Sequence, residues 1–147
     1  MQIINKNDEG IGEICAKGPN IMLGYYENEE KTKEVLENGW FKTGDLGYID
    51  AEGYIFITGR KSDVIVLTNG KNVYPQELEF LINKIPFIQE SMVYSREETK
   101  TDTVLVEKIV YNKEIMEKEY NGKDYEEIIW NAIKEINKTL PTYKHIK

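Results

Sequence analysis

Cysteine and histidine are nearly absent from this sequence. Its 147 residues contain one cysteine, Cys15, and one histidine, His145. A single cysteine excludes a disulfide within the chain, and the two residues together cannot build a Cys/His zinc site or a two-histidine catalytic pair. The chain does not need such staples, because a domain of this length can bury a core of its own. We assign no metal ligand from the sequence.

Long hydrophobic runs are also missing. The longest uninterrupted ones, YIFI and VIVL, fall far short of the ~20 residues that a membrane-spanning helix requires. The first residues, MQIINKNDEG, lack the apolar core of a signal peptide. We therefore expect no transmembrane segment and a cytoplasmic location, which agrees with the low cysteine content.

Positive charge is in the minority. The 19 Lys and Arg residues face 26 Asp and Glu residues, and the formal net charge is -7. A chain with this balance has no overall positive field that would attract nucleic acid or an anionic membrane surface. We expect no nucleic-acid partner, and any anionic ligand must be held by local groups.

The first sixty residues are predicted to be rich in strands. GEICAK (12–17) alternates weakly, as a half-buried strand does. ENEEKTKEVLENG predicts a short helix that Asn28 caps and that ends just before Gly39.

Two β-hairpins are predicted next. LGYIDAEGYIFIT has DAEG as a four-residue turn, and pairing Ile49 with Tyr54 would place Asp45 opposite Thr58. In the second hairpin, VIVL is followed by NVY. There the two residues of a type I′ turn, both with positive φ, would be Asn69 and Gly70.

Helices and strands with clearer periodicity follow. Pro75 suits a first helical turn, apolar residues recur with helical spacing, and Pro86 ends the helix. Strands are predicted at IQESMVYS and TDTVLVEKIVYN, separated by the charged turn REETKTD. A long helix should begin near Asp124. The order of elements predicts an α+β fold, with a domain boundary in GRKSD (59–63). The apolar stripes are Leu78, Leu81, Ile82 and Ile85 in the first helix, and Ile129, Ala132, Ile133 and Ile136 in the last.

Asp45 and Arg60 form the first candidate site. Adjacent strands lie ~4.8 Å apart, so both residues should emerge at the open end of the first hairpin, within about two strand spacings. A carboxylate can accept hydrogen bonds from the two hydroxyls of a ribose, and a guanidinium suits phosphate or ribose oxygens. The alternative is an aspartate that caps its own turn beside a solvated arginine, and spacing alone favours it.

The TNGKN segment is the second candidate. It does not fit a phosphate-binding P-loop, because Ile65 stands where glycine is needed and Asn72 where Ser or Thr is needed. A tight hairpin turn with a solvated lysine accounts for Asn69, Gly70 and Lys71. Four aromatic residues could stack on a base, although such clusters in strand-rich segments are more often core: Tyr25, Tyr26, Trp40 and Phe41.

Longer motifs resemble a known family. GWFKTGDLGYIDAEGYIFITGRKSDVIVLTNGKNVYPQELE is similar to two signature motifs of the adenylate-forming superfamily, which contains acyl-CoA synthetases, firefly luciferase and the adenylation domains of peptide synthetases. GEICAKGPNIMLGYYENEEKTKEVL and NKTLPTYK resemble its flanking motifs, so the likeness covers nearly the whole chain. The variant GRKSDVIVLTNGKNVYPQELE resembles bacterial long-chain fatty acyl-CoA synthetases.

This resemblance implies an activity and a domain organisation. Enzymes of the superfamily convert a carboxylate and ATP, with Mg²⁺, to an acyl-adenylate and pyrophosphate, and then transfer the acyl group to coenzyme A. Residues 1–60 would be the end of the large AMP-binding domain, and residues 61–147 most of a small C-terminal domain that rotates on it. ATP or AMP, the acyl substrate, a fatty acid by this resemblance, coenzyme A and the remaining N-terminal domain are the implied partners. The fold would be an α+β arrangement in which a strand-rich part joins, at a hinge, a hairpin and a short sheet flanked by helices.

The resemblance also implies roles for single residues. Asp45 matches the aspartate that binds both ribose hydroxyls, and Arg60 the arginine that contacts ribose or phosphate. Ser62 falls on the hinge position, where the family usually has Asp or Lys. The turn that lines the pantetheine tunnel after rotation matches Asn69, Gly70 and Lys71.

Other parts of the family's active site have no counterpart here. The phosphate loop would precede Met1, and the motif with the adenylation lysine would follow Lys147, so we assign no catalytic residue and give that role to neither Lys144 nor Lys147. The chain alone is expected to be inactive, and the acyl chain length cannot be inferred. The alternative is a non-catalytic binding or interaction module derived from an adenylate-forming enzyme.

Overall fold

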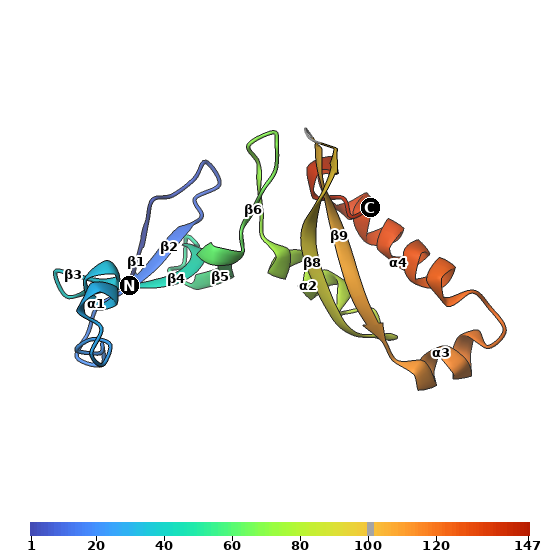
Figure 1. Cartoon of the computed structure of the whole chain (residues 1–147), viewed down its shortest axis with the longest axis horizontal. Helices are drawn as coiled ribbons and strands as arrows, with labels where there is room; N and C mark the ends of the chain where they lie inside the picture. The colour runs from blue at the N-terminus through green and yellow to red at the C-terminus, as the bar shows by residue number, and fades with distance from the viewer. Residues whose placement is uncertain (100–101) are drawn as a thin grey trace. The chain divides into compact units, whose positions relative to one another are not determined.

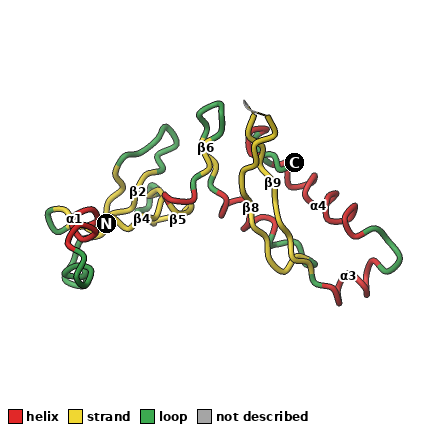
Figure 2. The backbone as a smooth tube through the Cα atoms, in the orientation of Figure 1, coloured by secondary structure: helices red, strands yellow, loops and turns green. Residues whose placement is uncertain are grey.

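The chain folds into two units in a computed structural model, which describes residues 1–99 and 102–147 (Figure 1). The first is Met1–Asp63 and the second is Val64–Lys147. The division falls after Asp63, at the end of GRKSD. Figure 2 shows that strands and loops dominate the first unit, whereas the second combines a long hairpin with helices. The α+β class is confirmed.

An antiparallel sheet of five strands forms the first unit. Strand β2 (Gly12–Ala16) and the hairpin strands β4 (Trp40–Ile49) and β5 (Ile55–Arg60) were predicted, whereas the short strands β1 (Gln2–Ile4) and β3 (Leu36–Glu37) were not. In the sheet the order is β1-β2-β4-β3, and β5 pairs with β4.

Helix α1 (Glu29–Val35) begins as predicted, because the Asn28 side chain accepts a hydrogen bond from the Lys31 N–H at 2.9 Å. It ends earlier than expected. The next two residues form β3, and the two-residue loop to β4 has positive φ at Asn38 (52°) and Gly39 (79°). These angles and the two-residue length are those of a type I′ hairpin turn.

The predicted pairing of the β4–β5 hairpin is wrong by one residue. Ile49 pairs with Ile55, not Tyr54, because the Asp50 N–H donates to the Tyr54 carbonyl at 3.0 Å and closes a three-residue loop. Its last residue, Gly53, has a φ of 90°. A three-residue loop of this kind needs one residue with positive φ rather than two.

In the second unit, β6 (Ile65–Val66) and β7 (Asn72–Val73) form the other predicted hairpin. Its turn is not type I′. Gly70 has a positive φ of 77° and Asn69 does not. The Leu67 N–H donates to the Lys71 carbonyl at 2.9 Å, so this loop also has three residues. We call these three residues and the two that flank them, residues 67–71, the hairpin loop.

Both predicted helices of the second unit are confirmed as α2 (Pro75–Ile82) and α4 (Tyr125–Thr139). Asp124 caps α4 through its side chain, which accepts from the N–H groups of the first turn. The hairpin of β8 (Ile88–Thr99) and β9 (Asp102–Tyr111) takes in most of REETKTD, whose remaining two residues, 100–101, lie outside the described residues. Helix α3 (Lys113–Tyr120) was not predicted; two 3-10 turns, η1 (Lys61–Asp63) and η2 (Thr142–Lys144), complete the list.

The core of the second unit lies between the β8–β9 hairpin and the helices. Apolar side chains from every helix and from β6 to β9 meet there, and truncating one of them to alanine is expected to cost about 2–5 kcal/mol. No helix among the described residues is long and apolar enough to cross a membrane. The fully buried members are Val73, Leu78, Ile82, Leu105, Met116, Ile133 and Ile146.

Candidate functional site

Asp45 and Arg60 are brought together by the first unit. They are register partners across β4 and β5, not the Asp45–Thr58 pair that the sequence predicted. Their side chains form an ion pair through Arg60 Nη1 and Asp45 Oδ1. The hydrogen bond to Asp45 raises the pKa of Arg60 above its ordinary value, so this guanidinium stays charged.

Thr43 fixes the backbone beneath this pair. Its hydroxyl donates to the Ile14 carbonyl of β2 at 2.8 Å and accepts from the Asp45 N–H at 3.0 Å. Arg60 Nη1 also donates to the Thr43 carbonyl at 3.3 Å. Gly44, which lies between Thr43 and Asp45, has a φ of 76° that a residue with a side chain rarely adopts. The backbone next to the Asp45 carboxylate is therefore held by hydrogen bonds from both neighbouring strands, β2 and β5.

The carboxylate of Asp45 keeps a free acceptor. Its Oδ2 has no hydrogen-bond partner within residues 1–99 and 102–147, and its side chain is 30% exposed. The Arg60 side chain is 56% exposed. A guanidinium has five N–H donors, and here Nη1 makes the hydrogen bonds to protein. Both groups can therefore bind a ligand without giving up their mutual ion pair.

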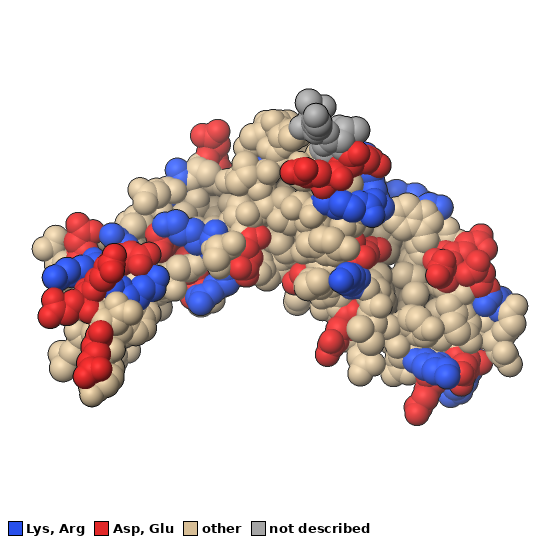
Figure 3. Space-filling model, in the orientation of Figure 1, with Lys and Arg blue, Asp and Glu red and all other residues tan. Residues whose placement is uncertain are grey.

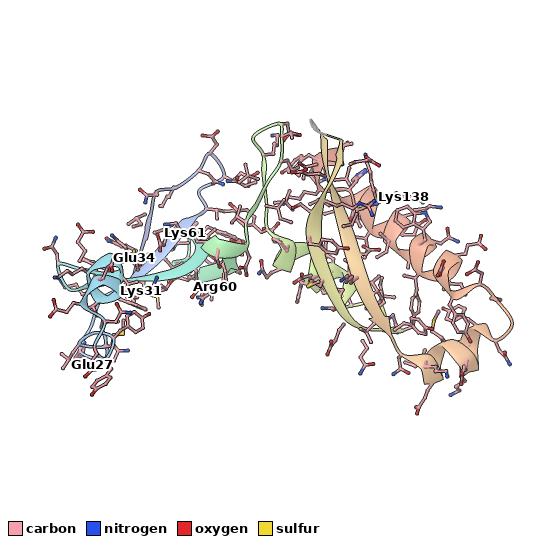
Figure 4. All side chains as sticks on the ribbon, in the orientation of Figure 1. Glu27, Lys31, Glu34, Arg60, Lys61 and Lys138 are labelled. Atoms are coloured by element: carbon pink, nitrogen blue, oxygen red, sulfur yellow. The ribbon has the colours of Figure 1, made fainter. Side chains whose placement is uncertain are left out.

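A cleft of about 620 Å³ lies beside Arg60. Figure 4 labels four of its charged residues, Lys31 and Glu34 on α1, and Arg60 and Lys61 at the end of β5 and the start of η1. Figure 3 shows that acidic and basic side chains are interspersed in this unit. The polar and charged rim of the cleft suits a polar anionic ligand. The lining residues are Glu13, Tyr25, Lys31, Glu34, Val35, Phe41, Lys42, Thr43, Gly44, Arg60, Lys61 and Ser62.

Glu13 was missed by the sequence analysis. It points inward from β2, with a side chain only 8% exposed, and its Oε2 accepts from Lys61 Nζ at 2.9 Å. A buried carboxylate is stable only when it is paired and hydrogen-bonded. This ion pair ties η1 to the sheet directly after Arg60. A lone glutamate in GEICA gives no signal of a partner that lies 48 positions away.

The four candidate aromatic residues do not form a core. Tyr25 and Tyr26 are 43% and 90% exposed, and Trp40 and Phe41 are half-buried. Tyr25 and Phe41 line the cleft, so these two can contact a ligand there. The interpretation of this cluster as core is therefore wrong.

The remaining predicted residues have local partners. Ser62 lies in η1, where its hydroxyl donates to Asp63 Oδ1 at 2.8 Å. In the hairpin loop, Asn69 Oδ1 accepts from the Lys71 N–H at 3.0 Å, and a Cβ added at Gly70 would meet nothing within 4 Å. The Lys71 ammonium lies 5.0 Å from the centre of the Tyr143 ring. Their roles as hinge and tunnel residues stay predictions.

The sequence of the second unit decides the family. The family described as AMP-binding enzyme C-terminal domain matches residues 62–147, more than half of the chain. The chain belongs to this family. This places it in the adenylate-forming superfamily, as its motifs predicted.

Relatives of the chain are named CoA ligases. A 2-succinylbenzoate–CoA ligase of Bacillus cereus is 40% identical over 108 residues, which cover 74% of the chain and 22% of the relative. The Listeria innocua protein of the same name is 43% identical over 102 residues, 69% of the chain and 22% of the relative. The chain thus spans about a fifth of the length of these curated relatives.

Solved structures agree with the family assignment. The Bacillus subtilis o-succinylbenzoate CoA synthetase in complex with its acyl-adenylate intermediate matches with a TM-score of 0.74 and 34% identity, over 91% of the chain and 25% of that protein. The same enzyme has also been solved with ATP and a magnesium ion. These relatives correct the predicted subfamily, because they are succinylbenzoate ligases and not long-chain fatty acyl-CoA synthetases.

Proposed function

We propose that the chain is the C-terminal portion of an AMP-forming CoA ligase and that Asp45 and Arg60 bind the nucleotide. The observation that carries this proposal is the unpartnered Oδ2 of Asp45 beside the charged guanidinium of Arg60, which lines the cleft. Vicinal ribose hydroxyls are donors that match a carboxylate, and a charge-assisted hydrogen bond is about twice as strong as a neutral one. Tyr25 offers a ring for contact with the base.

The proposed reaction has two steps. A substrate carboxylate attacks the α-phosphorus of ATP and displaces pyrophosphate, which gives an acyl-adenylate. The thiol of coenzyme A then attacks the acyl carbon, loses its proton and displaces AMP. The chain's own part in the first step is to hold the ribose through Asp45 and Arg60. Among the described residues no three His, Cys, Asp or Glu side chains gather as metal ligands do, so we place no magnesium ligand on them.

The second unit would serve the thioester step. We propose Ser62, one residue before the last residue of the first unit, as the hinge position. The hairpin loop, with Asn69, Gly70 and Lys71, would line the channel that admits the pantetheine arm of coenzyme A. Residues 68–71 of the loop are exposed, and there is open space around Gly70, which supports this role. Residues 1–60 and 61–147 would then belong to the large and the small domain of the ligase.

The substrate class follows from the relatives. We propose 2-succinylbenzoate, because the B. cereus, L. innocua and B. subtilis proteins carry that substrate in their names. ATP and coenzyme A as co-substrates agree with a cytoplasmic enzyme.

A chimera tests the proposed function. Residues 1–147 replace the aligned segment of the B. subtilis o-succinylbenzoate CoA synthetase, and formation of 2-succinylbenzoyl-CoA is measured beside the unmodified enzyme. We expect activity from the chimera and none from the 147-residue chain alone. A folded chimera that binds AMP as the unmodified enzyme does but forms neither adenylate nor thioester would favour the non-catalytic alternative.

A further inference from the structure

The NKTLPTYK motif (137–144) has no role in the function proposed above. It begins in the last turn of α4 and runs through η2. Asn137 makes two hydrogen bonds with the backbone of Ile146: its Oδ1 accepts from the N–H at 3.0 Å, and its Nδ2 donates to the carbonyl at 2.8 Å. The segment between them is thereby closed into a loop against the end of α4. This leaves Tyr143 and Lys144 at fixed places on it.

Lys144 connects this segment to α2. Its Nζ lies 2.8 Å from Glu77 Oε2, and the two side chains are only 15% and 31% exposed. Glu77 lies in the first turn of α2, which directly follows the β6–β7 hairpin. The ion pair is the least exposed in the second unit, so solvent screens it less than the surface pairs.

Tyr143 connects the same segment to the hairpin loop. Its ring centre lies 5.0 Å from Lys71 Nζ, within the range of a cation–π contact. The hairpin is short, with two residues in each strand, and a Cβ at Gly70 would meet no neighbour within 4 Å. A two-stranded hairpin of this size is marginally stable without support. Ile65, Leu67 and Val73 anchor this hairpin in the core of the second unit, and the contact between Tyr143 and Lys71 adds support at the exposed residues 68–71.

We propose that Tyr143 and Lys144 are positioning residues, which hold the hairpin loop in place for the thioester step. Lys144 fixes η2 on α2 through Glu77, and Tyr143 fixes the ammonium of Lys71. The link to coenzyme A rests on the function proposed above for the loop. The positioning itself does not, because it concerns contacts within the second unit.

Hydrogen exchange of the 147-residue chain tests the positioning directly. The reporters are the N–H of Leu67, bound to the Lys71 carbonyl at 2.9 Å, and the N–H of Gly70, bound to the Leu67 carbonyl at 2.8 Å. In Tyr143→Leu both should exchange about 2- to 5-fold faster, the factor that corresponds to losing an exposed cation–π contact. Tyr143→Phe keeps the ring and should exchange as the unmodified chain does. Unchanged exchange in Tyr143→Leu would overturn the proposal.

A matched control separates this effect from general loosening. Tyr120 also carries a lysine over its ring, with Lys123 Nζ at 5.7 Å, but it belongs to α3. Tyr120→Leu should leave exchange at Leu67 and Gly70 unchanged. Equal acceleration by Tyr120→Leu and Tyr143→Leu would show a global effect and contradict positioning.

Charge exchange tests the other contact. Lys144→Glu alone places two carboxylates together and should speed exchange in the hairpin loop, and adding Glu77→Lys should restore it. Failure of the double variant to recover, with the single variant impaired, contradicts the role of this ion pair.

In the chimera, Tyr143→Leu should raise the KM for coenzyme A about 2- to 5-fold and leave pyrophosphate exchange unchanged. Altered hydrogen exchange with unaltered coenzyme A kinetics would uphold the positioning and reject the loop's role in the thioester step.

Discussion

Asp45 pairs directly with Arg60 because β5 carries one extra residue, Thr58, which bulges out of the pairing with β4. Leu46 pairs with Gly59 and Gly47 with Ile57, so Thr58 has no partner of its own on β4. A bulge of this kind shifts the register by one residue, and each residue then faces the opposite side from the one a regular ladder would give. An arginine that follows the bulge is thus placed beside the aspartate. Bulges are frequent next to functional sites.

The ion pair of the buried Glu13 with the exposed Lys61 should stabilise the first unit. Lys61→Met leaves a carboxylate that is 8% exposed without its partner, and we expect a loss of about 1–3 kcal/mol in the free energy of unfolding. Trp40 in a Trp130→Phe background reports on this unit alone during urea unfolding. The control is Lys33→Met, which breaks an exposed pair with Glu29 and should cost under about 0.5 kcal/mol. Equal losses in the two variants would show that the burial of Glu13 is unimportant.

A bulky residue at Gly70 should separate the two half-reactions. In the chimera, Gly70→Leu should lower acyl-CoA formation at least about tenfold and spare pyrophosphate exchange, because coenzyme A enters only in the second step. Leucine at a φ of 77° also costs of order 1 kcal/mol in folding.

Gly53→Leu controls for that strain. Gly53 ends a three-residue loop of the same kind, with a φ of 90° and nothing within 4 Å of an added Cβ. It should show the folding cost without the selective loss of the thioester step. If both half-reactions fall together in a folded Gly70→Leu chimera, the hairpin loop does not line the coenzyme A channel.

Glu107 should make the stability of the second unit depend on pH. Burial between β9 and α4 raises the pKa of Glu107 to about 7, and its Oε2 has no hydrogen-bond partner in the described part of the chain. The unfolded chain has the lower pKa, so the folded state binds the extra proton between about pH 4.5 and pH 7. Stability is therefore greatest below about pH 4.5 as far as this group is concerned. It falls as the pH rises to 7, by less than the full shift in pKa would give, because solvent reaches part of the carboxyl group.

Urea unfolding followed by Trp130, in a Trp40→Phe background, measures this slope. Glu107→Gln should remove it and stabilise the unit at pH 8. Glu126 is exposed and, like Glu107, lines a cleft between β9 and α4; Glu126→Gln should keep the slope. A slope that persists in Glu107→Gln assigns the titration to another group.

Local signals in the sequence predicted α2 and α4 well, but missed α3. Pro75 and Asp124 mark the starts of α2 and α4, and the helical spacing of their apolar residues is read from neighbouring positions. The hairpin turns were harder. Asn-Gly forms the type I′ turn at Asn38 and Gly39, but part of a three-residue loop at Asn69 and Gly70. The difference depends on how the flanking strands pair, which the dipeptide itself does not encode.

The candidate site shows the same limit. Asp45 and Arg60 were predicted to share one end of a hairpin, but the bulge at Thr58 that makes them direct partners follows from packing in the sheet. Glu13 could not be found at all, because its partner Lys61 is distant in sequence and ordinary in type. Motif resemblance identified the superfamily correctly. The likeness to long-chain fatty acyl-CoA synthetases is not supported by the relatives, which are named 2-succinylbenzoate–CoA ligases.

Asp45 is proposed to bind a nucleotide and not merely to cap a turn. Asp50 in the same hairpin provides the comparison, because its carboxylate accepts from the N–H groups of Glu52 and Tyr54 at 3.0 and 2.8 Å and has that turn-capping role. The measurement is the affinity of the chimera for AMP, by calorimetry, in Asp45→Ala and Asp50→Ala. We predict that Asp45→Ala weakens AMP binding by about 1.5–3 kcal/mol, roughly 10- to 150-fold, while Asp50→Ala lowers stability and leaves the affinity unchanged. Equal AMP affinity in the folded Asp45→Ala and unmodified chimeras would contradict the account.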